Sequence, residues 1–124
     1  MTPIDKVERL RGVNALLSAA LIIAAYRYCI RNPDRTIRVT EGLRSPDRQR
    51  KLVAQNKSWR LNSLHIVGRA VDIAIMENGE PLWDLEFYRD YNEDVQFACD
   101  KLSLIITWGG DWPQRDGVHF QLEN

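Results

Sequence analysis

Apolar residues along the chain recur with two periods, one typical of helices and one typical of strands. Polar and apolar residues alternate over residues 36–40 and 117–122, and short apolar runs cover 70–76 and 104–108, so each of these segments is predicted to be a strand. Between them, residues 84–102 are predicted to be a helix, because apolar residues recur there at helical spacing: Phe87, Tyr91, Val95, Ala98 and Leu102.

Capping residues and turn formers set the remaining boundaries. The segment Thr2-Pro3-Ile4-Asp5 has the features of a helix N-terminus, and that helix is predicted to continue, with a break at Gly12, to about residue 30. Ser45-Pro46-Asp47 opens another predicted helix that ends near residue 55. Asn78-Gly79 is a strong turn signal after the strand at 70–76.

The order of these elements is helix, strand, helix, strand, helix, strand, strand, which predicts an α+β fold with a small, mostly antiparallel sheet packed with helices. With 124 residues, the chain is expected to form a single domain over residues 1–124. Its parts are an N-terminal helix region at 3–31 and a core at 36–122.

Charge and cysteine content exclude some classes of protein. Residues 1–62 carry 13 basic and 5 acidic side chains, a net +8, whereas residues 63–124 carry 4 basic and 12 acidic, a net −8. This balance argues against a uniformly basic nucleic-acid-binding protein. Two cysteines make at most one bridge, so a disulfide-dense secreted module is excluded, and Cys29 and Cys99 are expected to be buried free thiols.

The apolar run at residues 13–26 has two interpretations. It is short of the roughly 18 apolar residues that indicate a membrane span, and a buried core helix is the favoured interpretation. A signal peptide or export anchor is the alternative, because basic residues precede the run.

Asp72 lies in the apolar strand at 70–76, where a carboxylate needs a hydrogen-bonding partner, a counter-charge or a metal ion. One interpretation is a salt bridge to an arginine. The other is a three-ligand zinc set with His65 and His119, which leaves a fourth position for water. His119 is expected, with Gln121, on the face of the last strand that its apolar neighbours do not use.

Two further residues could carry out chemistry beside such a metal. Asp116, three residues before His119, is either a solvated turn residue or a general base for a metal-bound water. Arg44 is either a surface arginine or a positive charge that stabilises an oxyanion.

Several motifs in the same order resemble the zinc D-Ala-D-Ala carboxypeptidase family, which includes VanY-type and VanX-type peptidases and phage L-alanyl-D-glutamate endopeptidases. Residues 63–72, SLHIVGRAVD, match its SxHxxGxAxD pattern, and residues 116–119, DGVH, its (E/D)xxH signature. Residues 41–45, EGLRS, with Gln49 resemble the upstream G-x-R-S…Q element. Residues 108–112, WGGDW, resemble the phage endolysin branch.

The resemblance implies a Hedgehog/DD-peptidase-like fold and one Zn²⁺ held by His65, Asp72 and His119. It implies that Asp116 is the catalytic base and that Arg44 polarises the scissile carbonyl. Supporting or substrate-binding roles fall to four more residues: Ser63, Gln49, Trp108 and Trp112.

The expected function is hydrolysis of a bond in the peptidoglycan stem peptide, with the L-alanyl-D-glutamate bond of an endolysin-type enzyme preferred. The alternatives are a D-alanyl-D-alanine carboxypeptidase and, from another class, a zinc-bearing binding domain without turnover. We expect a monomer with no nucleic-acid partner and no stable membrane span. It would remain in the host bacterial cytoplasm until released to the wall, unless residues 13–26 act in export.

Overall fold

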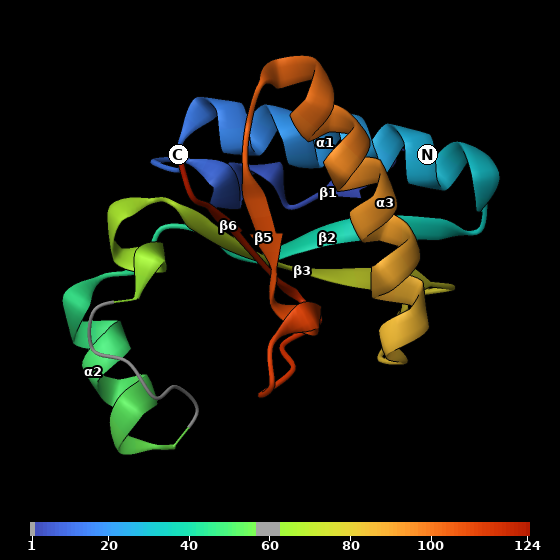
Figure 1. The fold of residues 1–124 in the computed structure, drawn as a ribbon. Helices are drawn as coiled ribbons and strands as arrows, with labels where there is room; N and C mark the ends of the chain where they lie inside the picture. Colours follow the sequence, from blue (N-terminus) through green and yellow to red (C-terminus); the bar gives the residue numbers. More distant parts are fainter. Residues whose placement is uncertain (1, 57–62) are drawn as a thin grey trace.

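The computed structural model describes residues 2–56 and 63–124, so residues 1 and 57–62 of the predicted single domain lie outside the described residues. The described strands form one sheet in the order β1-β2-β3-β6-β5, with β4 paired to β3 (Figure 1). Only β1 and β2 pair in parallel among the described strands, which confirms the mostly antiparallel sheet. The bounds are β1 Ile4–Asp5, β2 Arg35–Glu41, β3 Ala70–Glu77, β4 Glu80–Leu82, β5 Ile106–Trp108 and β6 His119–Leu122.

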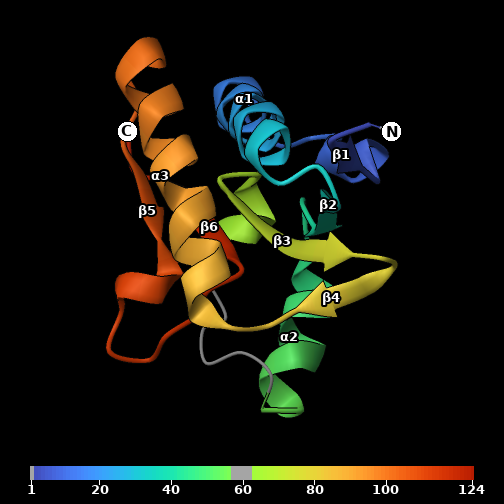
Figure 2. The same ribbon diagram turned by 90° about the vertical axis from the view of Figure 1, so that its right-hand side faces the viewer.

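Three helices lie on two sides of this sheet. Helices α1 and α3 cover one face, whereas α2 projects from the opposite side (Figures 1 and 2). Their bounds are α1 Ala15–Arg31, α2 Pro46–Ala54 and α3 Leu85–Leu102, and the described 3-10 turns are η1 Val7–Leu10, η2 Leu64–Val67 and η3 Gly109–Asp111. The predicted α+β class is therefore confirmed.

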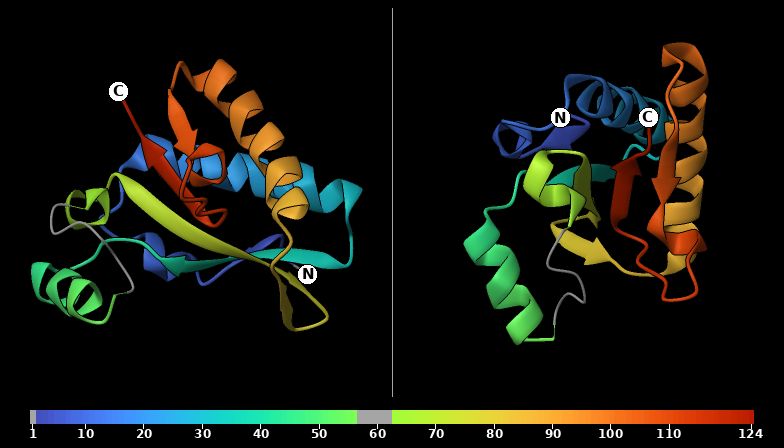
Figure 3. Two further views of the ribbon diagram at one scale, coloured as in Figure 1. Left: turned by 60° about the horizontal axis from the view of Figure 1, so that its bottom comes forward. Right: turned by 60° about the vertical axis from the view of Figure 1, so that its left-hand side comes forward.

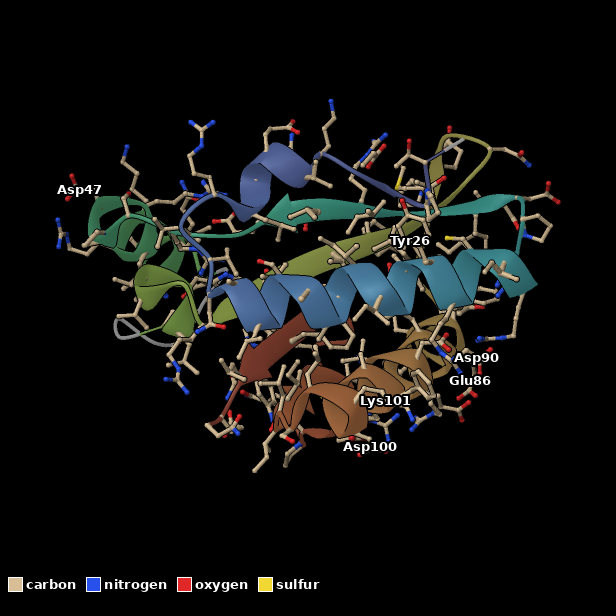
Figure 4. The ribbon with its side chains drawn as sticks, turned by 90° about the horizontal axis from the view of Figure 1, so that it is seen from above. Tyr26, Asp47, Glu86, Asp90, Asp100 and Lys101 are labelled. Carbon is tan, nitrogen blue, oxygen red and sulfur yellow. The ribbon has the colours of Figure 1, made fainter. Side chains whose placement is uncertain are left out.

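The core lies between the sheet and the pair α1 and α3, which run side by side when viewed from above (Figure 4). Tyr91 of α3 links the layers, because its ring makes edge-on contacts with Tyr28 of α1 and with Phe120 of β6, and its hydroxyl donates a 2.9 Å hydrogen bond to the Leu21 carbonyl. The apolar run at 13–26 thus contributes to the core, as its favoured interpretation required.

None of the described helices combines the length and apolar character that crossing a membrane would require.

The predicted helix start at Thr2-Pro3 is wrong. Ile4 and Asp5 instead form β1, which pairs with β2 and buries Ile4, so tertiary burial outweighs the local capping signal. Lys6 and Gly12 both have positive φ, which prevents a continuous helix before α1. Helix α1 begins only at residue 15, where the Asn14 side chain accepts hydrogen bonds from the first free backbone N–H groups.

The other boundaries agree closely with prediction. Ser45 caps α2, and Asn78-Gly79, both at positive φ, forms the turn between β3 and β4. Strand β4 was not predicted, because it is only three residues long and contains a proline. Cys29 and Cys99 are buried and free, as expected.

Candidate metal centre and active site

Three predicted ligands converge on the face of the sheet opposite α1 and α3. Antiparallel pairing places His119 of β6 directly across from Asp72 of β3, and η2 carries His65 just before β3 begins. His65 Nε2 lies 3.2 Å and His119 Nδ1 3.0 Å from the same oxygen, Asp72 Oδ1. Both imidazoles are buried and Asp72 is partly exposed, so the cluster is open to a ligand on one side.

The outward nitrogens of the two imidazoles face oxygen acceptors. His65 Nδ1 lies 3.0 Å from the Gly42 carbonyl, and His119 Nε2 lies 2.9 Å from Gln121 Oε1. The orientation of the Gln121 amide is itself set, because its Nε2 donates to Glu123. The outward nitrogens therefore act as N–H donors, and the inward nitrogens are directed at the cluster.

Three inward atoms meet here: His65 Nε2, His119 Nδ1 and Asp72 Oδ1. Because all three attract positive charge, a proton or a cation between them stabilises the arrangement. Burial opposes ionisation of Asp72, but the two histidines outweigh it and hold the pKa of Asp72 well below its usual range. Burial likewise opposes protonation of His119, yet the hydrogen bond that Asp72 accepts raises the pKa of His119. A metal ion would meet the same demand in place of a proton, and the three side chains present ligand atoms within 4.8 Å of one another.

Arg44 lies beside this cluster and is buried. One terminal nitrogen lies 3.8 Å from Asp72 Oδ2, Nη1 donates a 2.6 Å hydrogen bond to the buried Gln49, and Nε donates a 2.7 Å bond to Glu41 Oε1. The structure therefore brings Arg44 and Gln49 to the predicted site and excludes the interpretation of Arg44 as a surface arginine.

Glu41 is a site residue that the sequence analysis did not identify. A β-bulge at Thr40 shifts the register of β2, so that Glu41, and not Thr40, lies across from Asp72. Burial alone would raise the pKa of Glu41, but hydrogen bonds from Arg48 and Arg44 keep the pKa below its ordinary value. Glu41 is thus a carboxylate shared by two arginines at the edge of the metal cluster.

Gln121 was also missed as a partner of the metal set. The alternation of the last strand placed Gln121 on the same face as His119, which was the available signal. No sequence motif indicated that Gln121 contacts His119 Nε2.

Asp116 is partly buried in the turn that leads into β6. Its backbone N–H donates to the Gly109 carbonyl at 2.9 Å, and its own carbonyl accepts from the His119 N–H at 3.1 Å. Burial raises the pKa of Asp116, and the negative charge of Asp72 adds to that rise. Asp116 is therefore electrostatically coupled to the cluster and is not a fully solvated turn residue.

The remaining predicted residues support the site in different ways. Trp108 is a core side chain, only 2% exposed, whose indole N–H donates to the Gly117 carbonyl beside Asp116. The Trp112 ring lies 5.2 Å from the His119 ring, at the cluster itself. Ser63 caps η2 by accepting a hydrogen bond from the His65 N–H.

Two comparisons with known proteins found matches to this chain. A family model described as phage L-alanyl-D-glutamate peptidase matches residues 5–123. A solved structure titled L-Ala D-Glu endopeptidase ChiX, from Serratia marcescens, superposes with a TM-score of 0.83 at 36% sequence identity, covering 94% of this chain and 84% of that one. A search of curated protein sequences gave no significant match.

The fold and this likeness define a class of protein, the peptidases with a VanY-like α+β fold. Within that class, the chain belongs to the phage L-alanyl-D-glutamate peptidase family.

Proposed function

We propose that this protein is a zinc-dependent endopeptidase that hydrolyses the L-alanyl-D-glutamate bond of peptidoglycan stem peptides. The observation that carries the proposal is the convergence of His65, Asp72 and His119 beside Asp116 and Arg44, in a chain of this family. The similar Serratia protein, whose title gives the same activity, supports the choice of bond.

Zinc is the metal that best suits the donor set. Two imidazole nitrogens and one carboxylate oxygen are typical of catalytic zinc sites, which keep a further position for water or substrate. Both imidazoles already have their outward nitrogens hydrogen-bonded, as zinc-binding histidines usually do. Zinc bound here would polarise the scissile carbonyl and make a water molecule more acidic.

Asp116 is the proposed general base. It accepts a proton from the attacking water and delivers that proton to the leaving amine of D-glutamate. The raised pKa of Asp116 suits this role, because a base whose pKa lies closer to the working pH can both take and return a proton.

Arg44 is the proposed stabiliser of the oxyanion that develops on the scissile carbonyl. Its bonds to Glu41 and Gln49 fix the guanidinium before substrate arrives, so little reorganisation is needed during the reaction. Ser63 and Trp108 act indirectly in this proposal, since they hold η2 and the turn at Asp116 in place. Trp112 borders the cluster and is the proposed aromatic wall of the substrate cleft.

Mass spectrometry of products from purified peptidoglycan tests the proposal. New fragments that begin with D-glutamate are the expected result, whereas release of D-alanine alone would identify a carboxypeptidase. Zinc binding without any product would identify a binding domain. Asp116→Asn preserves side-chain shape and should retain zinc yet lose activity, and wild-type turnover by this variant would refute the assigned base.

In this proposal the enzyme is an endolysin. It is a monomer made in the cytoplasm of the phage's bacterial host, and it reaches and cuts the wall once the membrane has been permeabilised.

A further inference from the structure

The substrate of the proposed reaction carries a negative charge beside the bond that is cut. Glutamate has two carboxyl groups, and the stem peptide can continue through only one of them, so the other is free. A carboxylate that leaves water for a binding cleft needs a cationic hydrogen-bond donor. Under the proposed function, on which this inference rests, a residue near the metal cluster supplies that donor.

Arg44 is poorly suited to this task. It is only 8% exposed, and its guanidinium is committed to Glu41 and Gln49 and faces Asp72. A second arginine, Arg48, lies on the first turn of α2 and meets the same carboxylate. Its Nε donates to Glu41 Oε1 at 2.8 Å and its Nη2 to Glu41 Oε2 at 3.2 Å.

The geometry of Arg48 leaves a donor available. Its side chain is 56% exposed, and no described residue accepts a hydrogen bond from its Nη1. Glu41 binds the edge of the guanidinium formed by Nε and Nη2, so the direction in which Nη1 points is fixed. Arg44 also pairs with Asp72, so the exposed edge of Arg48 is the accessible cationic donor of this group.

We infer that Arg48, held in place by Glu41, recognises the free carboxylate of the substrate's D-glutamate. Arg48 is thereby a specificity-determining residue, separate from the metal set and from Asp116. Helix α2 lies away from α1 and α3 (Figure 3), and one carboxylate, that of Glu41, joins Arg48 to the arginine that faces Asp72.

The test uses two synthetic stem peptides that differ in one group: the free carboxylate of D-glutamate, or its amide. Wild-type enzyme should cut the carboxylate peptide with a kcat/KM at least about tenfold higher, the range expected for one charge-assisted hydrogen bond. Arg48→Ala should lose that advantage, mainly through KM, so that it cuts the two peptides with similar kcat/KM, while it retains zinc. Arg50→Ala is the matched control, because Arg50 is an exposed arginine of α2 that pairs with Asp47 instead.

Two results would overturn the inference: a wild-type enzyme that does not distinguish the peptides, or an Arg48→Ala enzyme that still does. Loss of discrimination in Arg115→Ala, with Arg48→Ala unaffected, would assign the role to the exposed arginine beside Asp116 instead. A wild-type enzyme that cuts neither peptide refutes the proposed function itself, so the two failures are distinguishable.

Discussion

Gly109 sets the position of the proposed base, and its substitution by alanine tests the site geometry directly. A Cβ atom at Gly109 would lie 2.4 Å from the Asp116 carbonyl oxygen, whereas real Cβ contacts essentially never fall below 3.0 Å. The same atom would meet Asp116 Cβ at 3.1 Å and His119 Cβ at 3.2 Å. The turn must therefore move by about 0.6 Å or more, and displacements approaching 1 Å cost as much as a hundredfold in rate.

We expect Gly109→Ala to lower kcat by roughly 10- to 100-fold and to lower the free energy of unfolding by about 1–3 kcal/mol, as overpacking does. The assay is release of peptidoglycan fragments under saturating substrate, together with urea unfolding. Gly79→Ala is the matched control, because its positive φ disfavours alanine but a Cβ there meets nothing within 4 Å. The reasoning is refuted if folded Gly109→Ala enzyme keeps a kcat within twofold of wild type.

Four other properties can be measured. Chelation should abolish activity and lower Tm, and added zinc should restore both, since a ligand of the folded state alone stabilises it. Gln121→Ala should weaken zinc binding about 10- to 100-fold in a chelator competition, because it removes the outer partner of His119. Apparent zinc affinity, measured by calorimetry, should fall as pH decreases through the raised pKa of His119, because zinc must displace that proton. Asp94→Ala should lower the free energy of unfolding in urea by about 2 kcal/mol, because the buried carboxylate binds Arg27 and Arg31 of α1.

The chain offers a control variant for Gln121→Ala and another for Asp94→Ala. Gln96→Ala, which removes an amide bonded to the Ile106 carbonyl, should leave zinc affinity unchanged. Asp90→Ala, on the exposed side of the same helix as Asp94 (Figure 4), should cost less than half a kcal/mol, about the range of an ordinary surface substitution. In the metal-free protein, the raised pKa of His119 adds stability that is present at low pH and lost as pH rises through that pKa. The increase in Tm on zinc binding should therefore be larger at pH 8 than at pH 6, and the opposite trend would contradict this account.

The convergence of His65, Asp72 and His119 was predictable from the sequence because strand periodicity and pairing carry most of its geometry. Asp72 and His119 lie on strands whose alternation already separates core residues from site residues, and antiparallel pairing places them opposite each other. Gln121 follows the same rule and could have been found by it. Glu41 could not, because strict alternation from Val39 places it on the core face, and the bulge at Thr40 brings it to the site.

The N-terminal error has a different physical origin. A threonine, a proline and an aspartate in succession fit a helix N-terminus by local propensity alone. Ile4, however, pairs with Ile37 of β2 and is buried there, and this long-range contact outweighs the local signal. Local signals succeeded at Ser45, which caps α2, and at Asn78-Gly79, which forms the turn after β3.

The manner in which α2 is attached to the rest of the protein has an evolutionary consequence. Among the nine described residues of this helix, Gln49 alone is buried, while the three proposed metal ligands lie on the sheet and in η2. Under the proposed recognition by Arg48, mutations on the outer surface of α2 alter which stem peptides are accepted and leave the proposed metal ligands in place. Selection for a different substrate would then act on this single helix and leave the chemistry of the sheet unchanged.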